Sequence, residues 1–171
     1  MLIRDRSNME KAMDITYQDI VARRIEIEEK YQKRKANLQT DAAQLVKEYI
    51  ESLQLPGDLW GSGERKTPYV QTGFWNSTGN FERRPVRAAQ LDENCRLKFI
   101  IATAINTSVV GGEWVYIPVT VWTANGYLNV AVSDGKQALT ISSGDGEGRF
   151  LETAAILKQE VMQAMQEPGL L

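Results

Sequence analysis

The sequence predicts an α+β fold: a long N-terminal helix, an antiparallel β-meander of about 4–6 strands, and a C-terminal helix packed on the sheet. Apolar residues recur at helical spacing from Ser7 to Leu53, a stretch that contains no Gly or Pro. After Arg96, apolar residues alternate in runs that end at short turn signals, and helical spacing returns after Gly148. We therefore expect residues 1–55 to form a helical oligomerisation segment and residues 56–171 to hold the sheet and the second helix.

The N-terminal helix is expected to be one continuous rod. Ser7 and Glu10 form a Ser-x-x-Glu capping box, and Pro56-Gly57 end the segment. At about 1.5 Å per residue, residues 7–53 would span roughly 70 Å. The predicted sheet measures only about 24 by 27 Å, so it would leave about half of such a helix uncovered.

The uncovered apolar stripe has to be buried by a second copy of the chain, by folding back, or by a partner protein. We favour a homodimer or a higher symmetric oligomer, because closed symmetry is the commonest solution for soluble chains. The stripe residues expected at this interface are Ile20, Ile27, Tyr31, Leu38, Leu45 and Tyr49.

Residues 54–95 are expected to connect the helix to the main sheet. Two short extended segments are predicted over residues 69–76 and 80–88, separated by a turn. The second contains Pro85, which places it at a sheet edge or outside the sheet.

Four strands follow Arg96, joined by turns at Gly111-Gly112, Asn125-Gly126 and Asp134-Gly135. Their aliphatic residues fall on one common face, which we expect to be the core. These residues are Leu97, Phe99, Ile101, Ile105, Val115, Ile117, Val119, Val121, Leu128, Val130, Val132, Leu139 and Ile141. The C-terminal helix is expected to cover this face with Phe150, Ala154, Leu157, Val161 and Met165.

The opposite face of the sheet alternates to aromatic and small residues rather than to polar ones. Its large aromatic residues are Trp114, Tyr116, Trp122 and Tyr127. Either residues 54–95 cover this face, or it is a recognition surface for a partner protein, since Trp and Tyr often anchor interfaces. Pro118 in the same strand favours an edge position or a bulge.

Residues 60–87 combine basic and aromatic side chains, among them Trp75, Arg83, Arg84 and Arg87. Such a mixture could follow a phosphate backbone while bases stack on the rings. The alternative is an ordinary solvated connection. Acidic residues lie inside the segment and the whole chain carries a net charge of −2, so the charge pattern favours nucleic acid only weakly.

Composition excludes several kinds of chemistry. The chain has no histidine and a single cysteine, Cys95. An internal disulfide, a zinc site built on paired thiolates, and histidine-dependent catalysis are therefore excluded. No catalytic, cofactor-binding or metal-binding residue is predicted, and no cofactor is expected. An enzyme that uses carboxylates or lysine is a third hypothesis, with its candidates at Asp92, Asp134, Asp145 and Glu147.

Two further expectations concern a loop and the location of the protein. Residues 142–148 are interpreted as a flexible turn with an acidic cap for the next helix, because they match no phosphate-binding motif. The absence of an apolar leader and of a long uncharged run predicts a cytoplasmic protein with no membrane partner.

Together these patterns predict a non-enzymatic interaction protein, such as an adaptor, a chaperone-like factor or an inhibitor, that acts as a homo-oligomer and binds another protein. Nucleic-acid or nucleotide binding through residues 60–87 is the alternative.

Overall fold

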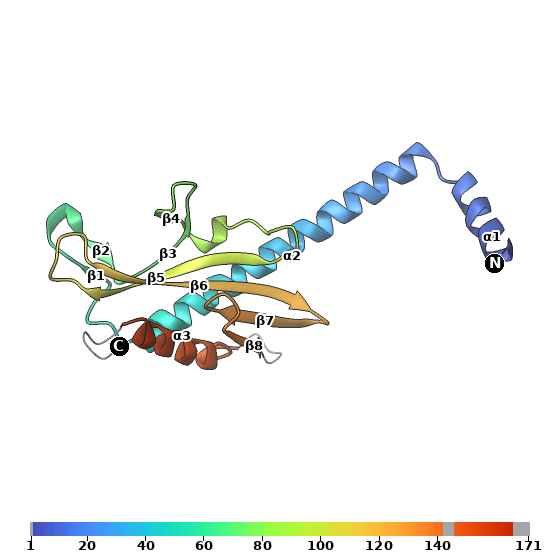
Figure 1. The fold of residues 1–171 in the computed structure, drawn as a ribbon. Helices are drawn as coiled ribbons and strands as arrows, with labels where there is room; N and C mark the ends of the chain where they lie inside the picture. The colour runs from blue at the N-terminus through green and yellow to red at the C-terminus, as the bar shows by residue number, and fades with distance from the viewer. Residues whose placement is uncertain (1, 142–145, 166–171) are drawn as a thin grey trace. The chain divides into compact units, whose positions relative to one another are not determined.

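The computed structural model describes residues 2–141 and 146–165, with side chains from residue 7 onward. The chain divides into two compact units, unit 1 (Met1–Arg34) and unit 2 (Lys35–Leu171). Figure 1 shows the elements in chain order. They are α1 (Leu2–Met13), α2 (Tyr17–Ser52), β1 (Leu59–Trp60), η1 (Gly63–Arg65), β2 (Thr67–Pro68), β3 (Val70–Trp75), β4 (Phe81–Arg83), η2 (Val86–Ala88), β5 (Leu97–Asn106), β6 (Glu113–Ala124), β7 (Tyr127–Val132), β8 (Gln137–Ile141) and α3 (Leu151–Ala164).

The predicted fold class is confirmed. Within unit 2, six antiparallel strands form one sheet in the order β4-β3-β5-β6-β7-β8, and β1 pairs with β2 separately. The strands from β5 to β8 are the predicted meander, and each pairs with the next in the chain (Figure 1). β4 is an edge strand, and Pro85, which has no N–H, lies outside the sheet two residues after the strand ends at Arg83.

The N-terminal helix is long but interrupted, which corrects the prediction of one rod from Ser7 to Leu53. α1 ends at Met13 and α2 begins at Tyr17. Thr16 caps α2: its N–H donates to Asp19 Oδ2 at 2.9 Å, and the N–H of Asp19 donates to Thr16 Oγ1 at 3.2 Å. This reciprocal cap restarts the helix, whereas Ser7, the predicted cap, lies inside α1.

The core lies between one face of the sheet and two helices of unit 2. α2 contributes Leu38, Leu45 and Tyr49, and α3 with its preceding residue contributes Leu157 and Phe150, all buried. Tyr49 also makes a buried hydrogen bond, because its hydroxyl lies 2.7 Å from Oγ1 of Thr103 on β5. Both helices therefore cover the aliphatic face that the alternation predicts.

Two predicted core positions are wrong for local reasons. The register of β5 against β6 shifts between Ala104 and Asn106, so Ile105 leaves the alternation and is 37% exposed. α3 ends at Ala164, one residue before Met165, and the Met165 side chain is 41% exposed.

Pro118 does not mark an edge, because β6 is a central strand between β5 and β7. The carbonyl of Pro118 accepts a hydrogen bond from the N–H of Ser133 at 2.9 Å, directly after β7 ends at Val132. The nitrogen of Pro118 faces the same side of the strand, beyond the paired part of β7. The missing N–H therefore lies at the end of the pairing with β7 and leaves the bonds with β5 intact, which explains how a central strand accepts proline.

Candidate functional site

Unit 1 exposes a dense group of apolar side chains. These side chains are Met9, Met13, Ile15, Tyr17, Ile20 and Ile27, and we call them the unit 1 apolar patch; Ile25 is also exposed but lies on another side of α2. Ile20 is 60% exposed and Ile27 is 53% exposed, and their separation of seven residues places them on one side of α2. Tyr31 continues this stripe and is half-buried. Exposed apolar side chains that lie close together are typical of an interaction surface.

The polar side of the same helix is internally paired. The Glu26 carboxylate forms ion pairs with Lys30 at 3.0 Å and with Arg23 at 3.3 Å. The Lys30 ammonium and the Arg23 guanidinium hold the pKa of the Glu26 carboxyl below its ordinary value. Gln32 likewise donates to Glu28 at 2.9 Å. These polar side chains thus find their partners on the same helix. The apolar patch is not covered by other side chains among the described residues of unit 1.

The other residues expected at the oligomer interface, Leu38, Leu45 and Tyr49, are buried inside unit 2. Leu38 and Leu45 are fully buried and Tyr49 is 1% exposed, all within the core of unit 2. Their side chains are already in contact with the sheet and α3, so an oligomer interface can use them only if unit 2 opens. The self-association proposal below therefore keeps Ile20, Ile27 and Tyr31.

The second face of the sheet is partly covered by residues 54–95 and partly open. Trp60 of β1 lies against Trp114, with ring centroids 6.1 Å apart, and Trp114 Nε1 donates to the carbonyl of Gly111 at 2.8 Å. The Arg96 guanidinium lies 4.3 Å from the ring centroid of Trp122. Tyr127 remains 52% exposed. Residues 54–95 thus cover part of this face, and its role as a recognition surface stays a prediction.

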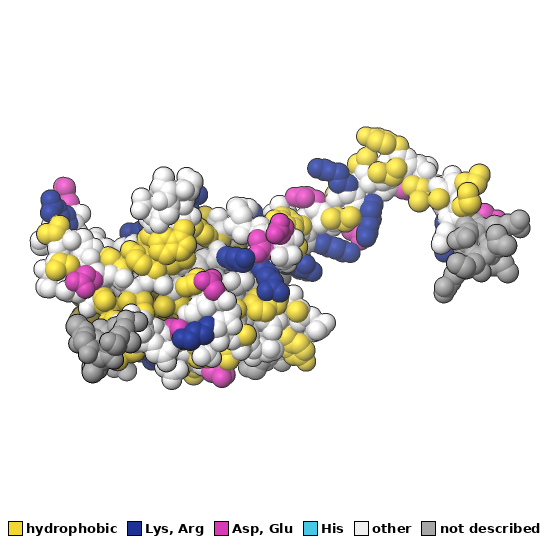
Figure 2. Space-filling model, in the orientation of Figure 1, with side chains coloured by type: hydrophobic (Ala, Val, Ile, Leu, Met, Phe, Trp, Pro, Cys, Tyr) yellow, Lys and Arg dark blue, Asp and Glu magenta, His cyan; other side chains and the backbone are white. Residues whose placement is uncertain are grey.

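An aromatic cluster on this face joins side chains of β4, β3 and β6. Tyr116 lies 5.1 Å from both Trp75 and Phe81, measured between ring centroids, and Trp75 lies 6.2 Å from Phe81. Trp75 is 52% exposed and Tyr116 is 37% exposed. Figure 2 shows hydrophobic side chains gathered where β3 and β4 lie in Figure 1. The cluster is an exposed, preformed platform.

Gly73 makes the aromatic cluster possible. A Cβ at this position would lie 2.0 Å from the carbonyl oxygen of Glu82 and 2.8 Å from Cζ of Phe81. The Phe81 ring therefore occupies space that only glycine leaves free. The pairing of Trp75 with Phe81 was missed in the sequence, although the turn between residues 76 and 80 indicates a hairpin that sets these two residues opposite each other.

Beside the cluster is a hollow of about 320 Å³ on the same face. Its lining residues are Phe74, Trp75, Lys98, Phe99, Ile100, Pro118, Val119, Thr120 and Asp134. Lys98 forms an ion pair with Asp92 at 3.4 Å. The hollow thus combines an apolar floor with one cation and one carboxylate.

The four nucleic-acid candidates do not form one surface. Trp75 belongs to the aromatic cluster, and Arg83 follows Phe81 by two residues on β4. Arg84 forms an ion pair with Glu82, with Nη2 at 2.7 Å from Oε1. Arg83 and Arg84 line one hollow beside α2, and Arg87 in η2 lines the hollow that adjoins it. The three arginines thus lie near one another at the edge of the sheet, whereas the Trp75 side chain belongs to the aromatic cluster.

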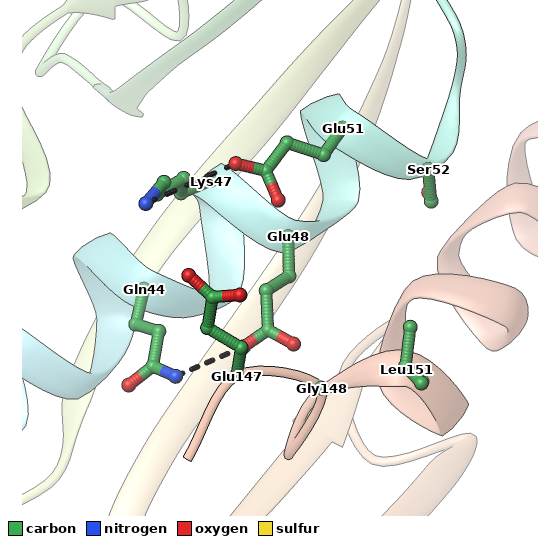
Figure 3. A pocket seen from close by; sticks show the side chains of 8 residues that line it. All are labelled: Gln44, Lys47, Glu48, Glu51, Ser52, Glu147, Gly148 and Leu151. Atoms are coloured by element: carbon green, nitrogen blue, oxygen red, sulfur yellow. Dashed lines mark hydrogen bonds and ion pairs between the residues drawn. The ribbon is translucent and has the colours of Figure 1, made fainter. Parts of the chain in front are cut away.

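A larger hollow, of about 610 Å³, lies between α2 and the start of α3 (Figure 3). Its carboxylates are Glu48, Glu51 and Glu147. Glu48 is buried and accepts hydrogen bonds from Gln44 Nε2 at 3.1 Å and from the N–H of Phe150 at 3.4 Å. Glu48 therefore caps the N-terminus of α3 and joins it to α2, which gives this hollow a structural explanation.

The carboxylates of the enzyme hypothesis lie apart. Asp92 shapes a turn: its Oδ1 accepts the N–H groups of Asn94 at 2.8 Å and Arg96 at 3.0 Å. Burial raises the pKa of the Asp92 carboxyl, but these hydrogen bonds and the Lys98 ammonium outweigh burial and lower it. Asp134 and Glu147 line different hollows.

Residues 142–145 of the predicted turn at 142–148, Asp145 among them, lie outside the described residues. Among the residues that the structure describes, no group of three or more acidic or cysteine side chains could hold a metal ion. Within that same part of the chain, none of the helices is sufficiently long and apolar to cross a membrane.

Comparisons with known proteins identify no relative of this chain. Models of protein families, curated proteins and solved structures were each compared with the chain, and none matches. The function has to be inferred from the surfaces of this chain.

Proposed function

We propose that this protein is a non-enzymatic, cytoplasmic interaction protein that self-associates through unit 1 and presents the open face of its sheet to a partner protein. The observation that carries the proposal is the unit 1 apolar patch within residues 9–27. An adaptor, a chaperone-like factor and an inhibitor all fit this description, since each presents a preformed surface.

The density of the patch matters energetically. Complete burial of one isoleucine side chain contributes about 1.5–3 kcal/mol. Association of two chains costs about 4–15 kcal/mol in lost translational and rotational freedom. One or two exposed side chains could not offset that cost, whereas several buried together can. The patch supplies several on consecutive turns.

The partner surface in this proposal is the aromatic cluster with the adjoining hollow. Trp75 and Tyr116 are partly exposed and already held by their neighbours, so little side-chain entropy is lost when a partner covers them. Aromatic residues with preset positions are typical anchors of protein interfaces. Trp122 and Tyr127 extend the surface along the same face.

Light scattering coupled to gel filtration tests self-association. We expect the full chain to show at least twice its own mass of 19.2 kDa at micromolar concentration. Replacing Ile20 and Ile27 together by lysine should return the mass to that of one chain. The matched control replaces Gln18 and Ala22 by lysine, which adds the same charges on the other side of α2. A single-chain mass for the unaltered protein at every concentration refutes the proposal.

Nucleic-acid binding is a second candidate, and the shared position of Trp75, Phe81 and Arg83 at one end of the sheet favours it. Bases could stack on Trp75 while Arg83 contacts a phosphate. Fluorescence anisotropy with a labelled single-stranded oligonucleotide tests this candidate. Affinity should fall as salt rises and should be lost when Trp75 becomes alanine. No anisotropy change at low salt removes the candidate.

A further inference from the structure

Unit 2 has a groove between α2 and the edge of the sheet. Two adjoining hollows, of about 370 and 470 Å³, share Val46, Thr72 and Pro85. We call them together the edge groove. Their lining residues are Ala43, Val46, Lys47, Ile50, Glu51, Val70, Gln71, Thr72, Arg83, Arg84, Pro85, Val86 and Arg87.

The edge groove exists because the edge strand is short. β4 pairs with β3 only from Gly73 to Trp75, and the last contact is the N–H of Arg84 donating to the carbonyl of Thr72 at 2.9 Å. Pro85 then fixes the backbone and takes the chain out of the sheet. The earlier part of β3, from Val70, has no strand on this side.

The floor of the edge groove is apolar. Ala43, Val46 and Ile50 on α2 pack against the core but stay partly exposed, and Val86 lies opposite them. These α2 side chains lie three and four residues apart, so they form one stripe along the helix. A helix or an extended segment with apolar side chains could cover this stripe.

The rim of the edge groove is positively charged. Lys47, Arg83, Arg84 and Arg87 line it, against one carboxylate from Glu51. Two of these cations already have acidic neighbours: Lys47 lies 3.8 Å from Glu51, and Arg84 forms an ion pair with Glu82. Across the described residues, neither Arg83 nor Arg87 forms an ion pair closer than 4 Å. The groove therefore favours an apolar ligand with net negative charge.

The same chain contains a segment of that chemistry. Residues 9–20 carry Met9, Met13, Ile15, Tyr17 and Ile20, all exposed. Their charged residues are Glu10, Asp14 and Asp19 against Lys11, a net charge of −2. On α1, Met9 and Met13 form one stripe with Glu10 beside it, and Asp14 follows the last residue of the helix. Residues 9–20 thus combine apolar side chains with carboxylates, which complements the apolar floor and the cationic rim of the edge groove.

We infer that the edge groove of one copy of this protein receives residues 9–20 of a second copy. The inference rests on the proposed self-association and names the surface that it uses. Each copy has one groove and one such segment, so a reciprocal exchange closes a two-fold dimer and leaves neither surface open. Docking of the segment on its own chain, and capture of an unrelated acidic helix, are the competing occupants.

Cysteine cross-linking locates the contact. Cys95 is first replaced by asparagine, which tolerates the φ of 57° at that position. One sample then carries Met13→Cys and another carries Arg87→Cys, and the two are mixed at equal concentration and treated with a short bismaleimide. Because each chain has one thiol, a bond between residues 13 and 87 can form only between two copies. We expect a heterodimer band from this mixture.

The matched control mixes Met13→Cys with Thr140→Cys. Thr140 is exposed on β8, at the opposite edge of the sheet from the groove. We expect little heterodimer from this control. Equal yields in both mixtures, while light scattering still shows a dimer, overturn the groove but leave self-association standing. A single-chain mass for the unaltered protein removes both.

A chain that carries both Met13→Cys and Arg87→Cys separates the competing occupants. Loss of both thiols without a dimer band shows that the segment occupies its own groove, which overturns the inference. A dimer band supports it.

Charge reversal supplies an independent test of the same contact. Replacing Lys47 and Arg87 by glutamate should weaken dimerisation about tenfold or more at low salt, measured by sedimentation. Adding Glu10→Lys and Asp14→Lys to the same chain should restore most of the affinity, because opposite charges then face each other again. Failure of this second pair to restore affinity overturns the inference. Raising the salt concentration should reduce both effects.

Discussion

The hydrogen bond between Tyr49 and Thr103 joins α2 to the centre of the sheet, and it can be measured by paired substitution. The two oxygens lie 2.7 Å apart. Tyr49 is 1% exposed and Thr103 is 7% exposed, so water cannot replace either partner. Each hydroxyl therefore depends on the other for its hydrogen bond in the folded state.

Removing both partners should cost less than the two single losses added together. Tyr49→Phe leaves the Thr103 hydroxyl buried without its partner, and Thr103→Val does the same to the Tyr49 hydroxyl. Each single change should destabilise the fold by about 1–3 kcal/mol. The double variant has no unpaired hydroxyl and keeps the shape of both side chains. Its loss should be smaller than the sum of the two single losses by about 1–3 kcal/mol.

Urea unfolding at neutral pH, followed by circular dichroism, measures the free energies. Tyr127→Phe is the control, because that side chain is 52% exposed and its hydroxyl can bond to water; its effect should stay within about 0.5 kcal/mol. If the two single losses simply add in the double variant, the hydroxyls act independently. The position of α2 on the sheet would then be held by packing alone.

Three further predictions concern pH and backbone space. Burial raises the pKa of the Tyr49 hydroxyl, so this group ionises first in the unfolded chain as pH rises past about 10. The free energy of unfolding should therefore decrease above that pH more steeply than in Tyr49→Phe, as measured by urea unfolding at a series of alkaline pH values. Gly73→Ala should force the Phe81 ring and the backbone of Glu82 away, costing about 1–3 kcal/mol and altering tryptophan fluorescence. The lowered pKa of Asp92 stabilises the fold above about pH 4 and this contribution is lost on acidification, so Asp92→Asn should flatten the acid limb of the stability profile.

Much of the fold was predictable because its signals are local. The turns at Asn125-Gly126 and Asp134-Gly135 set the lengths of the strands between them, and the alternation from Leu97 to Ile101 sets the buried face. The break in the helix was missed for a physical reason. Apolar spacing continues through residues 14–16, and only the pair Thr16 and Asp19 shows that a new helix begins there.

The surfaces were less predictable because they combine segments that are distant in sequence. The ring of Tyr116 on β6 contacts Phe81 on β4 only after β3 and β5 take their places between them. The edge groove depends on where β4 stops, and a strand of three residues gives too short a pattern to show its end. Composition revealed basic and aromatic residues in this segment, but it could not assign Trp75 and Arg87 to different surfaces.

The apolar stripe of α2 shows that apolar spacing alone does not predict which part of a helix is buried within its own chain. Ile20 and Ile27 repeat with the same spacing as Leu38 and Leu45, yet the first pair is exposed and the second is buried. The difference lies between the repeating residues. In unit 2 the stripe position between Leu38 and Leu45 is the buried Ala42, so the face stays apolar and can be buried by a sheet and a second helix together. In unit 1 the equivalent position is Arg24, and Arg23 beside it pairs with Glu26. A narrow stripe between charges fits one neighbouring element, which is the kind of contact that a second copy of this chain can supply.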